Sequence, residues 1–494
     1  MESRLSVCVV ASTAWLYTPA QRGRKCLLLS LIALLPLGLS GCAAKRLKLD
    51  FTGFEKVYAE TSNQEVLLNL ARLEHRDPTY FFKIGQITSA YKMAASLTGS
   101  GSYSVATSNP QLGGPTGGGT PSVSMENDPI FTFIPVNDET NAQLLLKPVP
   151  AETFYILYQQ GWRVDQLVRL MVDRIELTRV TAEKCTVESI RNVPPLASSQ
   201  LEDGFDADYS RDPEALTNYV TFLRTSAVVY WLQKHGHLLL RGSNTFVPYN
   251  LNSGLDVAPR AQDVVSASQK SAVWEQVGSK WFLGEKVFSP AFSLYPLHSN
   301  GSKLVPDIEQ IEEEILADPT MKELKQGAAL KVILHSLSDG FSIEGSDHQD
   351  SCTSTSAPQG LTAHLVMRSL IGLMAAAAQE QRPFDSLAHT NPVVPSSKFL
   401  SQDEQANVQP KFVDAVPAIE RVPLLRLTGE SKSEEMEPVI QVNYRGRNYR
   451  IADEKQAAVM DNSYWNRDLF RLIGQLSSQV TVDISKFPLT EILQ

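Results

Sequence analysis

The chain has 494 residues, which is enough for two or three domains. Apolar residues make up 43% of it and charged residues 20%, so packed cores are expected and wholesale disorder is excluded. Residues 1–41 carry four basic groups and one acidic group, so residues 42–494 keep 41 basic and 53 acidic groups, a net charge of −12. That charge has the wrong sign for a surface that binds nucleic acid or anionic lipid.

An apolar run from Cys26 to Cys42 follows a basic flank and ends in small residues. This order is typical of a secretory signal, because a membrane-spanning helix needs roughly 20 apolar residues. The last four residues, Leu39 to Cys42 (Leu-Ser-Gly-Cys), resemble the lipobox of bacterial lipoproteins at every position. The resemblance implies a signal peptide of residues 1–41, diacylation of the Cys42 thiol and acylation of the new amino terminus. An uncleaved anchor helix is the alternative, which Pro36 and Gly38 disfavour.

Lipidation implies a place in the cell envelope, since two or three acyl chains hold a protein firmly on a membrane. Ala43 stands where an Asp would be the inner-membrane retention signal of the lipoprotein family. The resemblance therefore implies the outer membrane, with the protein facing the periplasm. Residues 42–60 are predicted to form a tether. The expected partners are the membrane, through the lipid, and other envelope proteins.

Two cysteines remain once the signal peptide and the lipidated residue are set aside, namely Cys185 and Cys352. In an oxidising compartment they can form one disulfide, although the sequence does not give their separation in space. The sequence contains no C-x-x-C and no Cys/His cluster at zinc spacing, so neither a structural zinc site nor another cofactor is predicted.

The first predicted module, residues 61–190, opens with a helix and a β-hairpin. Polar residues from Thr61 to Glu65 predict a helix start, and leucines at helical spacing follow. From Ile84 to Leu97 the hydrophobic period is two, which predicts a long amphipathic strand. Residues 98–124 are rich in Gly, Ser, Thr and Pro and are expected to form a mobile loop or the far end of the hairpin. The remaining predicted elements of the module are the return strand 129–136, helices 137–146, 151–160 and 164–175, and strand 179–188.

The predicted central module covers residues 191–380. Asp212-Pro213-Glu214 is a strong helix start, with a cap, a proline in the first turn and an early acid. This helix is predicted to end near residue 236, and the other predicted helices are an acidic one at 307–316 and a long one at 361–379. Strands are predicted at 237–242, near 281 and 291, and at 329–337. Polar loops are predicted at 191–210 and 340–358.

The carboxyl-terminal part consists of a Pro-rich linker or loop, residues 381–420, and a module of residues 421–494. A hairpin is predicted at 439–451, and a helix follows it with Trp465 and four aliphatic residues on one face. A last strand at 480–484 is possible. The predicted fold class is therefore α+β, with mixed helices, mostly antiparallel strands and one long hairpin with a Gly/Ser-rich tip.

Several short motifs together resemble a family of predicted proteobacterial lipoproteins. They are the lipobox, the helix at 63–73, Pro-Ile-Phe-Thr-Phe-Ile-Pro-Val at 129–136, Leu-Leu-Leu-x-Pro-x-Pro at 144–150, Arg-Ser-Leu-Ile-Gly at 368–372 and Val-Asn-Tyr-Arg-Gly-Arg-Asn-Tyr-Arg-Ile at 442–451. The motifs are scattered over most of residues 42–494, so the resemblance implies one extended module. It implies no activity, ligand or catalytic residue.

No catalytic motif is complete in the sequence. The nucleophile elbow G-x-S-x-G is missing, because Gly340-Phe-Ser-Ile-Glu-Gly345 has one residue too many. H-E-x-x-H and the P-loop are also absent. His235 and His237 flank a glycine and are interpreted as a helix cap and a partly exposed strand residue rather than as metal ligands.

Two acidic groups are interpreted as solvated charges. The first contains Asp347, His348 and Asp350, whose spacing fits no calcium loop. The second, Glu312 to Glu314, is predicted to lie on the wet face of a helix. We therefore predict neither a catalytic residue nor a metal site.

These observations favour a non-catalytic, lipid-anchored scaffold or subunit of an outer-membrane assembly. The first alternative is an oligomeric lipoprotein that inserts into a membrane or forms a channel with the hairpin 84–134, because membrane-spanning strands need about 9–11 residues. A long hairpin in a soluble sheet explains the same pattern, and Lys92 favours it. The second alternative is a periplasmic ligand-binding protein or enzyme whose site is assembled from distant residues. The ligand is unknown.

Overall fold

The computed structural model describes residues 51–100, 118–135, 143, 145–181, 184–195, 213–250, 253–295, 297–300, 303–326, 329–339, 341–344, 360–389, 412–427, 440–451 and 462–481. The fold class is α+β, as predicted. The chain divides into two compact units, residues 1–64 and residues 65–494, and each is considered by itself. Among the described residues, no helix is both long enough and apolar enough to cross a membrane.

The first helix is longer than predicted. It covers residues 51–74, whereas the sequence predicted a start at Thr61 and a tether as far as residue 60. Residues 51–60 contain good helix formers, and Lys56 and Glu60 form an ion pair one helical turn apart at 3.7 Å. The polar residues near Thr61 therefore continue a helix instead of capping one. The chain leaves the helix at Arg76, which has a φ of 59°.

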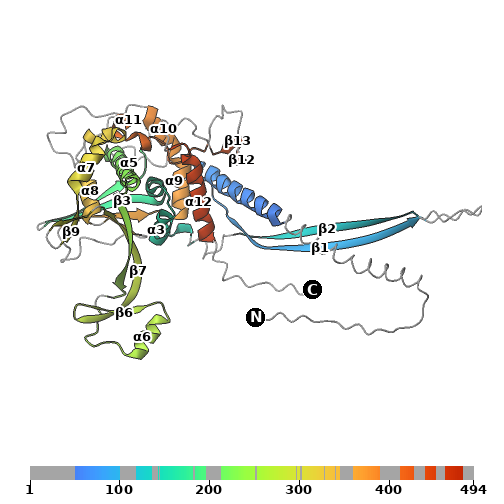
Figure 1. Cartoon of the computed structure of the whole chain (residues 1–494), viewed down its shortest axis with the longest axis horizontal. Coiled ribbons are helices and arrows are strands. Elements are labelled where there is room, and N and C mark those ends of the chain that lie inside the picture. Colours follow the sequence, from blue (N-terminus) through green and yellow to red (C-terminus); the bar gives the residue numbers. More distant parts are fainter. Residues whose placement is uncertain are drawn as a thin grey trace, which may run out of the picture. The chain divides into compact units, whose positions relative to one another are not determined.

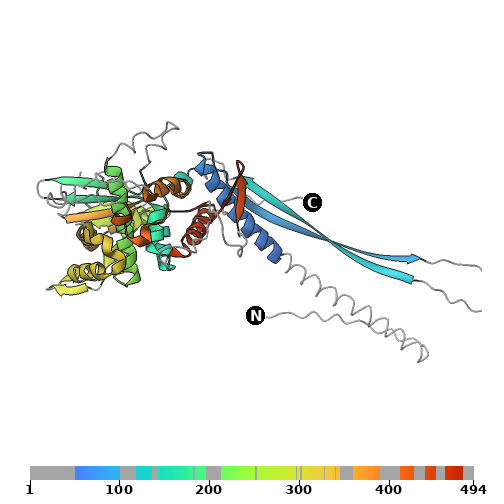
Figure 2. The ribbon, with the colours of Figure 1, turned by 90° about the horizontal axis from the view of Figure 1, so that it is seen from above.

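The long hairpin is formed by β1 (Phe82–Ser100) and β2 (Gly118–Pro135). The two strands pair antiparallel, from Phe82 opposite Pro135 to Ser100 opposite Gly118. Both strands are longer than predicted and include the two ends of segment 98–124, which was expected to be a mobile loop or the far end of the hairpin; residues 101–117 lie outside the described part. Figures 1 and 2 show β1 and β2 as a two-stranded ribbon, and these strands pair only with each other among the described strands.

The main sheet has the strand order β4-β3-β11-β10-β7-β5, with β6 paired to β7. Its strands are β3 (Val172–Val180), β4 (Cys185–Arg191), β5 (Leu238–Pro248), β6 (Val273–Val277), β7 (Lys280–Leu294), β10 (Phe341–Glu344) and β11 (Gly360–Met367). Only β10 and β11 are parallel neighbours among the described pairs. Strands from the predicted modules 61–190 and 191–380 share this sheet, so the predicted boundary near residue 190 does not separate two modules.

Two small hairpins complete the described strands. The pair β8 (Leu297–Asn300) and β9 (Lys303–Pro306) follows β7. The predicted carboxyl-terminal hairpin is confirmed by β12 (Gln441–Tyr444) and β13 (Arg447–Arg450). Arg445 and Gly446 between them both have positive φ, 49° and 78°, which suits a two-residue hairpin turn.

The described helices after the hairpin are α3 (Ala151–Gln159), α4 (Val164–Met171), α5 (Pro213–Lys234), α6 (Ala261–Ser268), α7 (Ile308–Ala317), α8 (Ala329–Asp339), α9 (Leu370–Gln379), α10 (Gln381–His389), α11 (Phe412–Ala415), α12 (Trp465–Thr481) and the 3-10 turns η3 (Pro319–Gln326) and η5 (Ala418–Glu420). The starts of α3, α4, α5 and α7 agree with the sequence prediction. Asp307 caps α7 by accepting a hydrogen bond from the Gln310 backbone N–H at 3.0 Å.

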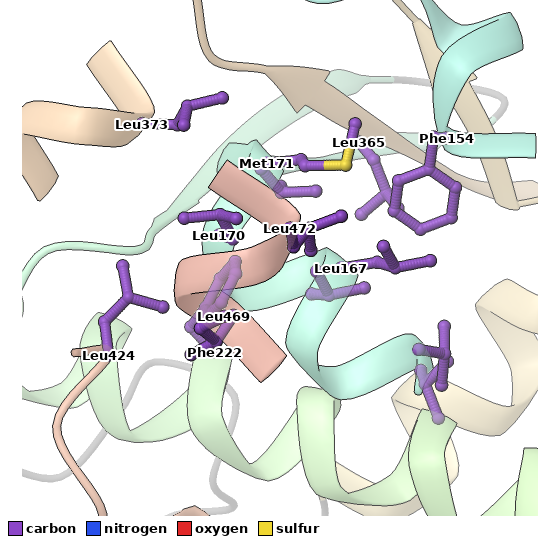
Figure 3. Packing of buried hydrophobic residues seen from close by; sticks show 14 of the residues in the cluster. Phe154, Leu167, Leu170, Met171, Phe222, Leu365, Leu373, Leu424, Leu469 and Leu472 are labelled. Atoms are coloured by element: carbon purple, nitrogen blue, oxygen red, sulfur yellow. The ribbon is translucent and has the colours of Figure 1, made fainter. Parts of the chain in front are cut away.

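Helix α4 lies at the centre of the core, because all eight of its residues are buried. Figure 3 shows how distant segments meet around it. The labelled core residues come from α3, α4, α5, β11, α9, the segment after η5 and α12: Phe154, Leu167, Leu170, Met171, Phe222, Leu365, Leu373, Leu424, Leu469 and Leu472. The predicted apolar face of α12 is confirmed by the burial of Trp465 and the aliphatic residues that follow at helical spacing.

Two predictions of secondary structure were wrong in the second half of the chain. Residues 329–337, predicted as a strand, form α8, in which Leu330, Ile333, Leu334 and Leu337 are buried at helical spacing. The predicted helix 361–379 is β11 followed by α9. The boundary lies at Ser369, whose hydroxyl accepts a hydrogen bond from the Gly372 N–H at 3.1 Å and caps α9.

Two further predictions need correction. The predicted helix 164–175 ends at Met171, because the next residues form β3 and pair with β11. The predicted linker 381–420 begins with α10, and its last part is core rather than linker. Residues 412–427 bury Phe412, Ile419 and Leu424, so this segment is folded onto the body.

The main sheet has two different faces. The core face carries large apolar side chains, including Ile175, Phe292, Phe341 and Leu365, all of which belong to the hydrophobic core. Because side chains alternate along a strand, the residues between them lie on the opposite face. We call this opposite face the second face. It carries polar side chains such as Ser342, His364 and Glu176 together with some apolar ones such as Val366.

Candidate functional site

The structure describes one of the three cysteines predicted to be modified. Cys42 lies outside the described residues, so its acylation stays a prediction. Cys185 is the first residue of β4 and is disulfide-bonded. Cys352 lies outside the described part, and the pair Cys185–Cys352 therefore also stays a prediction. Residues Asp347, His348 and Asp350 lie outside it as well.

His235 and His237 lie at the corner between α5 and β5. Gly236 has a φ of 76°, as expected for a glycine that ends a helix. The His235 ring stacks on Trp231 with ring centroids 4.1 Å apart. His237 stacks on the same indole and contacts the Glu314 carboxylate through Nε2 at 3.0 Å. The two histidines thus pack on one tryptophan at a structural corner.

The acidic residues Glu312 to Glu314 of α7 are only partly exposed to solvent. Glu313 is exposed, as predicted, but Glu312 and Glu314 are half-buried. Glu312 lies 3.9 Å from the Lys331 ammonium of α8, and Glu314 contacts His237. These carboxylates therefore attach α7 to its neighbours.

The most deeply buried charges surround Arg169 of α4, which has no exposed surface. One Arg169 nitrogen, Nη2, donates to Glu380 Oε1 at 3.0 Å, and Nη1 donates to Glu420 Oε2 at 3.3 Å. The Tyr219 hydroxyl donates to the same Glu380 oxygen at 2.7 Å. We call these four side chains the buried ion cluster. It joins α4, α5, the end of α9 and η5, which are far apart in the sequence.

A second set of buried polar contacts extends the cluster. Arg368 donates to the backbone carbonyls of Arg169, at 3.2 Å, and of Asn192. The Asn192 amide donates to the carbonyls of Arg169 and Val172 at 2.7 and 2.8 Å. Because α4 is followed directly by β3, carbonyls at this junction leave the regular helical pattern, and these side chains satisfy them.

Burial changes the protonation of two members of the cluster. It raises the pKa of Glu420 to about 7, against the attraction of Arg169 and with added repulsion from Asp165. Burial and the neighbouring Glu380 also raise the pKa of Tyr219 well above its usual range, so this hydroxyl remains a donor. The cluster can therefore hold a proton near neutral pH. The cluster is buried and therefore not accessible to a substrate. We call it a structural clamp, because its ion pairs and hydrogen bonds hold distant segments of the chain together.

The second face of the main sheet holds a more accessible group. In direct register across six strands lie Arg241 of β5, Ala291 of β7, Ser342 of β10, His364 of β11, Glu176 of β3 and Ser189 of β4. We call this set the polar row. Neighbours in register lie on the same face of a sheet, so the row crosses the whole face.

Ser342 and His364 are in direct contact within the polar row. The Ser342 Oγ lies 2.6 Å from His364 Nδ1. Glu176 is the direct antiparallel neighbour of His364 on the other side, and its Oε1 accepts a hydrogen bond from Arg174 Nε at 2.8 Å. Ser342, His364 and Glu176 are all half-buried. A hydroxyl, an imidazole and a held carboxylate therefore follow one another on three adjacent strands.

Three further hydroxyl side chains lie on this face. Thr178 and Ser293 lie on the second face, two residues along β3 and β7 from members of the polar row. The hydroxyls of Thr178, Ser189 and Ser293 are buried and have no hydrogen-bond partner among the described residues. Thr178 is only 2% exposed. Buried hydroxyls without partners are uncommon in folded proteins and call for a water or ligand.

Sequence reasoning came close to Ser342 but missed its partners. The segment from Gly340 to Gly345 was one residue too long for a nucleophile elbow, and the structure places Ser342 within a strand instead. His364 and Glu176 carry no motif of their own. Only the strand register brings them beside Ser342, and the sequence prediction had placed His364 in a helix.

No protein-family model, curated protein or solved structure matches this chain.

Proposed function

We propose that this protein is a lipid-anchored envelope protein that serves as a scaffold or subunit of an outer-membrane assembly. The observation that carries the proposal is the sequence Leu39 to Cys42 at the end of a short apolar run behind a basic flank. Acylation of Cys42 would tie the folded chain to the membrane without a spanning helix. The net charge of −12 after residue 41 also suits attachment through lipid better than attachment through a basic surface.

The long hairpin supports a role in assembly. β1 and β2 pair with each other, and no other described strand covers their outer edges. An isolated two-stranded hairpin is marginally stable in water, and open strand edges are a common place for another chain to add a strand. The hairpin is therefore the proposed contact region for an envelope partner.

The anchoring test replaces Cys42 with Ala in the full chain and follows processing and membrane fractionation. The expected result is an unprocessed or released protein. Cys26→Ala is the matched control, because Cys26 belongs to the same apolar run but not to the lipobox, and it should change neither property. Unchanged processing and membrane attachment of Cys42→Ala would contradict the proposal.

A second function is favoured by the length of the hairpin strands. β1 has 19 residues and β2 has 18, whereas a membrane-spanning strand needs about 9–11. At about 3.4 Å per residue, β1 extends for about 60 Å. Several lipidated copies that each contribute this hairpin would form an oligomer that inserts into the membrane.

The two functions differ in their dependence on the distal hairpin. Ala90 lies opposite Asp128, so replacing residues 90–128 with a short Gly-rich turn leaves the proximal ladder in register. If the hairpin forms a membrane oligomer, the full chain forms rings in mild detergent and conducts ions in vesicles, and the shortened chain does neither. If the protein is a scaffold, neither the full chain nor the shortened chain conducts ions, and shortening the hairpin abolishes only the binding of the partner protein.

A further inference from the structure

The polar row on the second face contains the elements of a nucleophilic site, which the scaffold role does not use. We propose that Ser342 is a nucleophile for small carboxylic esters, with His364 as its general base and Glu176 as a positioning residue. This inference goes beyond the proposed function and does not depend on lipidation or on the hairpin.

The nucleophile and its base are in direct contact. Ser342 Oγ and His364 Nδ1 are 2.6 Å apart, within the range that proton transfer requires. A serine hydroxyl is a weak nucleophile by itself and becomes effective when a neighbouring base accepts its proton. Because β10 and β11 are parallel neighbours in direct register, the backbone fixes this contact instead of leaving it to a mobile loop.

A carboxylate lies beside the base. Glu176 lies directly opposite His364 in an antiparallel pair, where Cβ atoms are about 4.5–5.5 Å apart. Arg174 holds the Glu176 carboxylate through a hydrogen bond of 2.8 Å. The proposed role of Glu176 is to orient the imidazole while His364 takes the serine proton. Glu176 thus acts through His364 and does not touch the reacting atoms.

The neighbour of the reacting hydroxyl on the other side is small. Ala291 is the neighbour of Ser342 in register on β7, so no large side chain occupies that position of the row. This position suits an ester with a small acyl group.

The proposed chemistry balances with water as the second reactant. The Ser342 Oγ forms a bond to the ester carbonyl carbon, and its proton passes to His364 Nδ1 while the carbonyl electron pair moves onto oxygen. When the carbonyl re-forms, the alcohol oxygen leaves with the electrons of the broken C–O bond and takes the proton from His364. Water then attacks the acyl-serine, His364 accepts a water proton, and Ser342 leaves as the hydroxyl again.

The test uses the full, purified chain and a fluorophosphonate probe, followed by peptide mass spectrometry. The expected result is an adduct on Ser342 that is absent in Ser342→Ala. His364→Gln should slow labelling by about 100-fold or more, since general bases contribute on the order of 10²–10⁴. Ser243→Ala is the matched control, because Ser243 is exposed on the edge strand β5 and donates only to the Ser289 carbonyl, at 3.0 Å. It should leave labelling unchanged.

Further variants separate an activated serine from a structural one. Glu176→Gln should slow labelling, by up to the ~10⁴-fold that replacing a triad carboxylate costs, and shift its pH profile, which a merely structural carboxylate would not do. Ser342→Cys should react with iodoacetamide faster than Ser243→Cys in the folded chain, because the first thiol lies beside the His364 imidazole. No adduct on Ser342 in the folded chain, equal labelling after His364→Gln, or equal reactivity of the two cysteines would overturn the proposal.

Discussion

The two faces of the main sheet use polar side chains in opposite ways. On the core side, Arg169, Glu380 and Glu420 are at most 4% exposed, and the arginine binds both carboxylates. On the second face, Ser342 and His364 are half-buried, and the neighbour of Ser342 on β7 is Ala291. The fully buried charges pair with one another and hold distant segments together. The half-buried serine and histidine keep some surface exposed to solvent. The following predictions, from the largest effect to the smallest, test this difference.

The largest effect is expected from Arg169→Met. The substitution leaves Glu380 and Glu420 buried without their cation, and breaking a buried ion pair costs about 3–5 kcal/mol. The free energy of unfolding in urea should fall by that amount. Arg179→Met is the control, because Arg179 is exposed on β3, and it should change the value by less than about 0.5 kcal/mol. Equal effects of the two variants would mean that the buried ion cluster is not a clamp.

A pH-dependent stability is expected from Glu420. Its pKa is about 7 in the folded state and about 4.5 as a free carboxyl, so the folded chain binds the proton more tightly. The corresponding stability is fully present below pH 4.5 and is lost as the pH rises through about 7. The loss is on the order of 3 kcal/mol. Urea unfolding at several pH values should show this decline for the natural chain and a flatter profile for Glu420→Gln. An identical decline in both chains would mean that Glu420 does not cause the pH dependence.

A smaller effect on the core side is expected from Tyr219→Phe. The change removes the hydroxyl that donates to Glu380 at 2.7 Å and leaves the ring in place. Buried hydrogen bonds to charged groups contribute about 1.5–3 kcal/mol. Thermal and urea unfolding should both show a loss of that size. A loss below about 0.5 kcal/mol would mean that Arg169 alone stabilises the buried Glu380 carboxylate.

The smallest effect, and one of opposite sign, is expected from Thr178→Val on the second face. The Thr178 hydroxyl is buried without a partner among the described residues, so an apolar group of the same shape removes an unsatisfied donor. The unfolding free energy should stay the same or rise by up to about 1 kcal/mol. A loss of more than about 1 kcal/mol would show that a bound water or ligand already satisfies this hydroxyl.

Much of the fold could be predicted where a local signal determines the structure. The start of α5 at Pro213, the cap of α7 at Asp307 and the turn at Arg445 and Gly446 each depend on a few adjacent residues. The elements that were predicted wrongly depend on partners that are distant in the sequence. The apolar run that forms α8 fits a strand or a helix equally well, and β11 becomes a strand because β3 and β10 flank it.

The candidate site was less predictable than the fold. Ser342 drew attention through an incomplete motif, but His364 lies 22 residues further along and Glu176 lies far before it. Only the register of three strands places them side by side. In the same way, Glu380 and Glu420 meet Arg169 because α9 and η5 pack on α4, and no spacing in the sequence indicates this.

The central claim, that the chain is lipid-anchored, is tested most directly by the intact mass of the native protein extracted from membranes. We predict the mass of residues 42–494 plus that of two or three acyl groups on Cys42. A chain without acyl groups that begins at any other residue would contradict the account.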